Sequence, residues 1–117
     1  MTVTVYNLHG ATVRRSANLR GVLLHYAAKP DDLVIKVKRE ESAGRYRVTF
    51  FWPRHGDSCE TTWQDWRVLL DWLAARRSWS IERVTFDAPL YDACEHDPRL
   101  ASFRKNVAPL TRHAYQS

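Results

Sequence analysis

The stretch LVIKVKREESAGRYRVTFFW, residues 33–52, contains two runs in which apolar side chains alternate with basic or polar ones. Successive side chains of a β-strand point to opposite faces, so each run predicts a strand with one apolar and one basic face. The short segment between the runs contains Gly44, as is typical of a β-hairpin. The stretch therefore predicts an antiparallel hairpin that packs its apolar face on a core.

The apolar pattern also predicts how the two strands pair. Placing the apolar side chains of both strands on one side puts Val37 opposite Tyr46. Lys38 then lies opposite Arg45, and Lys36 lies opposite Arg47. This register predicts two pairs of like charges on the basic face.

Helices and further strands are expected on both sides of the hairpin. Val3–Tyr6 alternates as a short strand, and an apolar stripe over residues 19–26 predicts a helix that begins at Ser16 and ends at Lys29–Pro30. After the hairpin we expect a polar loop at 54–60, a helix over about 63–77, a strand at 80–87 and a short helix over 97–105.

This order of elements predicts an α+β fold. Its simplest closure is a four-stranded, mainly antiparallel sheet with two helices on one face, in a ferredoxin-like or split βαβ arrangement, followed by a short C-terminal helix or tail. A chain of 117 residues has room for one domain. We expect that domain over residues 1–106 and a flexible tail over 107–117.

Composition predicts a cytoplasmic protein. The first residues lack the charged start and apolar run of a signal peptide, and no apolar stretch is long enough to cross a bilayer. Cys59 and Cys94 are too few for a disulfide framework, so we expect free thiols in a reducing compartment. No membrane partner is expected.

The net charge of +5 is concentrated in the N-terminal half. Residues 1–56 hold ten Lys or Arg against four Asp or Glu, a net charge of +6, whereas residues 57–117 hold eight against nine, a net charge of −1. A pI near 9.6 is typical of nucleic-acid-binding domains, although small basic proteins of other kinds share it.

The first candidate site is the basic hairpin face with the basic residues around the first helix. It comprises Arg14, Arg15, Arg20, Lys36, Lys38, Arg45, Arg47 and Phe51. Like charges that face one another across a strand pair repel, so a polyanion would relieve a cost already present. Phe51 lies on the same face, where an aromatic ring can stack on a base. The alternative is a solvated sheet face on which Glu40 and Glu41 reduce the repulsion.

The second candidate site is an interface on the helix over 63–77. Trp66 belongs to its apolar stripe, Trp72 flanks the stripe, and Trp63 and Trp79 stand at its two ends. Aromatic side chains are enriched at interface hot spots, so Trp63, Trp72 and Trp79 predict contact with a protein partner or a second copy of the chain. The alternative is a broad core helix beneath a sheet.

The third candidate is a zinc site. His55 and Cys59 lie in one predicted loop, and Cys94 and His96 lie in another, so the four could supply nitrogen and sulfur ligands. Neither spacing matches a C-x2-C knuckle or an H-x3-H helix turn, so we predict no metal and keep these four residues as a weak candidate set.

No enzymatic motif is present. The chain has no Gly-rich phosphate loop and no G-x-S-x-G elbow, and its Cys and His pairs do not by themselves predict an oriented base or an oxyanion pocket. We therefore expect neither an enzyme nor a cofactor. The leading hypothesis is a small basic intracellular accessory protein that contacts nucleic acid through the basic hairpin face, by charge and without reading sequence. The alternative is a protein-interaction module, which could be a homodimer, an adaptor or an inhibitor, that docks through the Trp-rich second helix.

Overall fold

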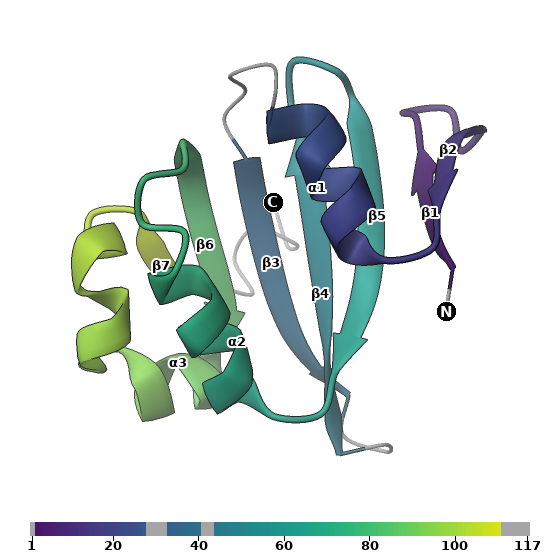
Figure 1. Ribbon diagram of the computed structural model, residues 1–117. Coiled ribbons are helices and arrows are strands. Elements are labelled where there is room, and N and C mark those ends of the chain that lie inside the picture. The colour runs from purple at the N-terminus through teal and green to yellow at the C-terminus, as the bar shows by residue number, and fades with distance from the viewer. Residues whose placement is uncertain (1, 28–32, 41–43, 111–117) are drawn as a thin grey trace, which may run out of the picture.

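The hairpin over residues 33–52 lies in the middle of a seven-stranded mixed sheet (Figure 1). The computed structural model describes residues 2–27, 33–40 and 44–110. The predicted helix stop at Lys29–Pro30, the hairpin tip at 41–43 and the tail from 111 onward lie outside these ranges.

The strands are not arranged in chain order. They are β1 Val3–Tyr6, β2 Thr12–Ser16, β3 Leu33–Glu40, β4 Arg45–Trp52, β5 Asp57–Trp63, β6 Ile81–Asp87 and β7 Val107–Leu110. Their order across the sheet is β2-β1-β5-β4-β3-β6-β7. Neighbours are antiparallel from β2 to β3, whereas β6 lies parallel to both β3 and β7.

The predicted four-stranded ferredoxin-like fold is therefore wrong. The strands over 3–6, 33–40, 45–52 and 81–87 are confirmed, but β2, β5 and β7 join them. β5 was expected to be loop and helix start because its sequence DSCETTW is mostly polar. It is nevertheless a strand, since it pairs with β4 along its whole length and with β1 on its other side.

Three α-helices and one 3-10 helix accompany the sheet in the described residues: α1 Leu19–Ala27, α2 Trp66–Ala74, α3 Ala88–Cys94 and η1 Pro98–Phe103. The first, second and fourth correspond to predicted helices, whereas α3 was not predicted. Ser16 does not begin α1 because it belongs to β2, and the Asn18 side chain instead accepts a hydrogen bond from the Gly21 backbone. Asp65 caps α2 by accepting from the Arg67 backbone, which starts this helix three residues later than expected.

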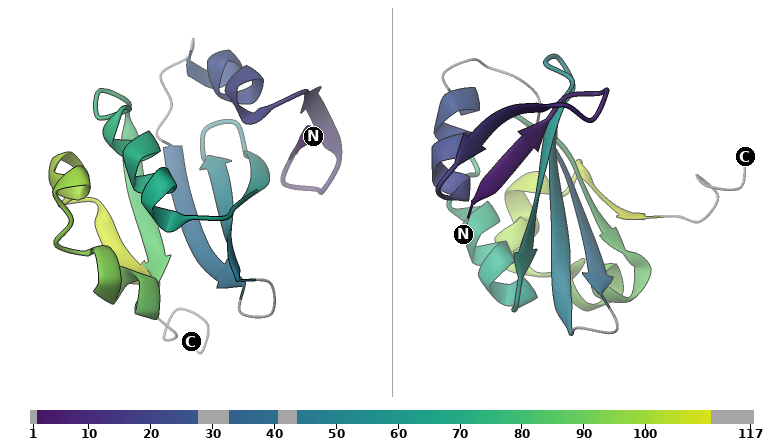
Figure 2. Two further views of the ribbon diagram at one scale, coloured as in Figure 1. Left: turned by 60° about the horizontal axis from the view of Figure 1, so that its bottom comes forward. Right: turned by 90° about the vertical axis from the view of Figure 1, so that its right-hand side faces the viewer.

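Both longer helices lie on the same face of the sheet (Figure 2). The core fills the space beneath them. Its fully buried large side chains are Phe50, Phe86, Ile35, Leu69, Leu70, Leu73 and Leu100. We use the term open face for the side of the sheet opposite α1 and α2. It comprises this side of β3, β4 and β5 and of the adjoining ends of β1 and β6. The described structure places no helix over β3–β5 on this side (Figure 2).

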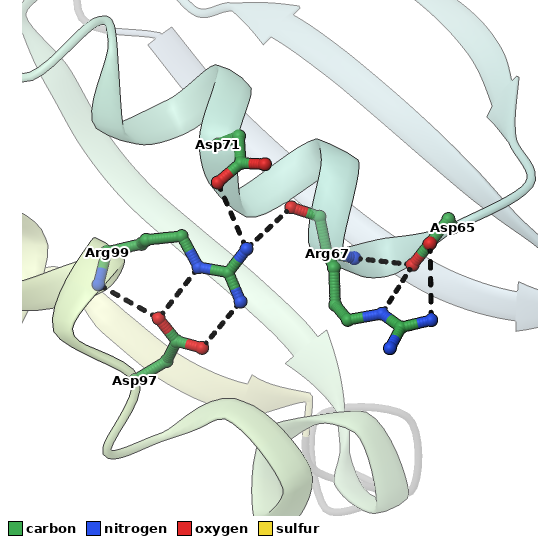
Figure 3. Close-up of polar contacts among 5 residues, drawn as sticks. All are labelled: Asp65, Arg67, Asp71, Asp97 and Arg99. Carbon is green, nitrogen blue, oxygen red and sulfur yellow. Dashed lines mark hydrogen bonds and ion pairs between the residues drawn. The ribbon is translucent and has the colours of Figure 1, made fainter.

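A polar network joins η1 to α2 (Figure 3). Arg99 donates twice to the Asp97 carboxylate, over 2.9 and 2.8 Å, and its Nη1 donates to Asp71 and to the Arg67 carbonyl, each over 3.0 Å. Hydrogen bonding from Arg99 lowers the pKa of Asp97 to about 2. The C-terminal part of the chain is thus tied to the second helix.

Residues 107–110, expected to belong to a flexible tail, form β7 beside β6. No helix in the described part of the chain has the length and apolar character needed to cross a membrane.

Candidate nucleic-acid interface

The observed register of the hairpin differs by two residues from the predicted one. Val37 lies opposite Val48, which puts Lys38 opposite Arg47 and Lys36 opposite Thr49. The prediction of two like-charge pairs is wrong, because only Lys38 and Arg47 face each other. Both basic strands still share the open face, since an even shift does not exchange the two sides of a strand.

Two carboxylates neutralise the arginines of β4. Glu40 lies opposite Arg45 and pairs with it over 2.9 Å and with Arg47 over 2.8 Å. Arg47 also pairs with Glu60 of β5 over 2.9 Å. Hydrogen bonds from Arg45 and Arg47 hold the pKa of Glu40 below its ordinary value. Arg45 and Arg47 therefore add little net positive charge to the open face.

The remaining cations of the open face lie on β3 and β6. Lys36 and Lys38 are exposed, and within the described ranges neither forms an ion pair with a carboxylate. Arg83 of β6 lies opposite Val34 and is also exposed. Sequence reasoning missed Arg83 because its segment alternates imperfectly, and only the pairing of β6 with β3 brings it to this surface.

An aromatic row crosses the same face at the end of the sheet near the β4–β5 turn. Phe51 is half-buried and lies opposite Val34 on one side and Ser58 on the other. Ser58 in turn lies opposite Tyr6, which is 44% exposed. Tyr6 was not predicted as a site residue. Its alternation with buried Val5 places it on the open face, but only the β1–β5 pairing places it in line with Phe51.

The three predicted arginines near the first helix do not form one surface with the hairpin. Arg14 lies opposite buried Val5, on the helix-covered side, where its Nη2 lies 2.8 Å from Nε2 of His25. Arg20 is exposed on α1. Arg15 lies opposite Thr4 on edge strand β2 and is the one member of the three on the side of the open face.

Arg14 and His25 belong to a polar cluster that fastens α1 to the β4–β5 turn. The Tyr26 hydroxyl donates to Asp57 over 2.7 Å, and its ring stacks on Trp52 with centroids 4.0 Å apart. The His55 ring packs edge to face against the Tyr26 ring, with the ring centroids 5.3 Å apart. Burial raises the pKa of Tyr26, and the hydrogen bond to Asp57 is the second largest cause of this rise. These contacts give His55 and Tyr26 roles in packing.

The three predicted interface tryptophans form one aromatic cluster. The Trp72 ring lies 6.0 Å from Trp63, 6.2 Å from Trp79 and 5.7 Å from Phe50, measured between centroids. The Arg76 guanidinium covers Trp72 at 4.0 Å. All three tryptophans are half-buried, so much of their apolar surface is already in contact within the chain.

The weak zinc candidates do not form a metal site. Cys59 and Cys94 are buried in the core, where burial raises their pKa values to about 12 and about 11. His55 packs on Tyr26, and His96 lines an open cavity of about 250 Å³ with Arg104 and Leu100. In the described residues no three His, Cys, Asp or Glu side chains are grouped so that they could hold a metal ion.

Comparison of the chain with protein-family models, with curated proteins and with solved structures finds no match.

Proposed function

We propose that this protein contacts nucleic acid through the open face, by charge and without reading sequence. The observation that carries the proposal is the exposure of Lys36, Lys38 and Arg83 on the open face. The described part of the chain places no helix over the central strands of this face. Phosphate groups are the partners that such unpaired cations attract, and binding of this kind needs no base-specific contacts.

The cations on which this proposal depends differ from those expected from the sequence. Arg45 and Arg47 are engaged by Glu40 and Glu60, so they orient the hairpin more than they attract a ligand. We propose an accessory role in the cytoplasm without catalytic activity. A reducing compartment fits the two cysteines, which are both free thiols.

The alternative, docking of a protein through Trp63, Trp72 and Trp79, has less support. These rings pack on one another, and Arg76 covers the middle one. A partner would find a smaller apolar surface there than three separate tryptophans would offer.

Fluorescence anisotropy with labelled oligonucleotides tests the proposal at several salt concentrations. We expect wild-type binding that weakens steeply with salt, and a Lys36→Gln/Lys38→Gln variant that binds more weakly. For a single strand, loss of two phosphate contacts reduces the magnitude of the negative slope of log K against log salt by about 1.4.

An Arg20→Gln/Arg77→Gln variant is the matched control. It removes the same total charge from exposed positions on or next to helices α1 and α2, away from the open face. We expect it to bind almost as well as wild type. Absence of wild-type binding at low salt, or equal weakening by both variants, would overturn the proposal.

A further inference from the structure

Two aromatic side chains and two cations share one end of the open face. Tyr6, Ser58, Phe51, Val34 and Arg83 follow one another across five strands, because each lies opposite the next in the register. Lys36 follows Val34 by two residues along β3, on the same side of the strand. Only Ser58 separates the two rings along this row.

From this row we infer that the ligand of the open face is a single-stranded nucleic acid, with bases stacked on Tyr6 and Phe51. The inference rests on the proposed function and names its substrate class. Every base has a flat π surface, so stacking on aromatic rings stabilises binding without sequence preference. Lys36 and Arg83 lie beside the row, within reach of the phosphates of such a strand.

The spacing of the rings favours a single strand over a duplex. Tyr6 and Phe51 lie on strands separated by β5, and adjacent strands are about 4.8 Å apart, so the two rings are anchored roughly 10 Å apart. Bases in a duplex strand repeat every 3.4 Å or so and are stacked inside the helix. Only an extended strand with splayed bases can present bases to both rings.

Charge makes a second copy of this chain a poorer occupant of the same face. A self-complementary contact would place the patch that contains Lys36, Lys38 and Arg83 against the same basic patch of the other copy. A polyanion compensates these charges instead. Glu40 and Glu60, which lie on the same face, are already paired with arginines of β4.

An abasic oligonucleotide separates stacking from charge. It carries the same phosphates as oligo-dT of equal length but has no bases. We expect the wild-type protein to bind oligo-dT at least about fivefold more tightly than the abasic strand and more tightly than a duplex, since each stacked base contributes that much or more.

A Tyr6→Leu/Phe51→Leu variant should bind both single strands equally, and a Tyr6→Phe/Phe51→Tyr variant should retain the preference because it keeps both rings. Urea unfolding checks that each variant is folded. If Phe51→Leu destabilises the chain, Tyr6→Leu alone serves, because Tyr6 is 44% exposed.

The outcomes separate the inference from the proposed function. Equal binding of oligo-dT and abasic strand by wild type, or a base preference that survives in the leucine variant, overturns stacking while charge-based contact stands. Absence of binding to any oligonucleotide at low salt overturns both. A dimer that the leucine variant dissociates would assign the face to a second copy and would also overturn the inference.

Discussion

At the scale of single residues, Tyr26 shows how one side chain joins elements far apart in the sequence. It comes from the apolar stripe of α1, as predicted, and is buried. Its ring covers Trp52 at the end of β4, and its hydroxyl donates to Asp57 at the start of β5. The stripe predicts that Tyr26 faces the core, but it contains no information about a hydrogen-bond partner 31 residues away.

Replacement of Tyr26 by Phe keeps the stack on Trp52 and removes the donor to Asp57. We expect the free energy of unfolding to fall by about 1–2 kcal/mol, because the partly buried carboxylate loses a hydrogen bond that water replaces poorly. Urea unfolding measures this loss. Tyr6→Phe, which removes a phenolic hydroxyl from an exposed position, should change stability by less than about 0.5 kcal/mol. Equal effects of the two substitutions would contradict a structural role for the Tyr26 hydroxyl.

At the scale of elements, the contact between η1 and α2 depends on a charged pair. Arg99 holds Asp97 within its own turn and reaches α2 through Asp71. The resulting low pKa of Asp97 links this contact to pH. The carboxylate is ionised more readily in the folded chain than in the unfolded chain, so its contribution to stability is present above about pH 4 and is lost as the pH falls toward 2.

We expect Asp97→Asn to lower the urea midpoint at pH 7 and to differ progressively less from wild type as the pH falls from 5 to 2. Unfolding curves at several pH values measure this difference. Asp92→Asn is the control, since Asp92 is exposed on α3. A difference between wild type and Asp97→Asn that stays constant down to pH 2 would show that the carboxylate charge does not stabilise the η1–α2 contact.

The hairpin shows which features of an element can be predicted from its own residues. Alternation assigned Val37 and Val48 to the core and Lys36 and Arg47 to the other face, and both assignments are confirmed. The register was wrong because the apolar pattern repeats every two residues, so a shift of two satisfies it equally well. Pairing of Glu40 with Arg45 accompanies the observed choice.

At the scale of the whole molecule, the sheet differs from the expected one because segments from the N-terminal and C-terminal parts of the chain form its two edges. β2 forms one edge, and β7 forms the other. β7 is short and contains Pro109, which cannot donate to a neighbour. Its four residues are nevertheless half-buried and lie along β6 from Val84 to Asp87.

A chain that ends at Asn106 should therefore be less stable than one that ends at Leu110. We expect a loss of at least about 1 kcal/mol, because hydrogen bonds to β6 are removed and the β6 edge is uncovered. Urea unfolding of the two truncated chains, with the full chain as reference, measures the loss. Equal midpoints for the two truncations would mean that β7 adds nothing to the stability of the sheet.

The sequence by itself determined the local features of this protein: the two-sided strands of the hairpin, the stripes of α1 and α2, and the basic character of one face. Each of these depends on the geometry of a single strand or helix, so a few neighbouring residues are enough to predict it. The tertiary structure alone decided that the polar segment DSCETTW is an inner strand, that Glu40 and Glu60 neutralise the β4 arginines, and that Tyr6 lies in line with Phe51. These features depend on which strands become neighbours, and that choice is made by backbone pairing and core packing across the whole chain.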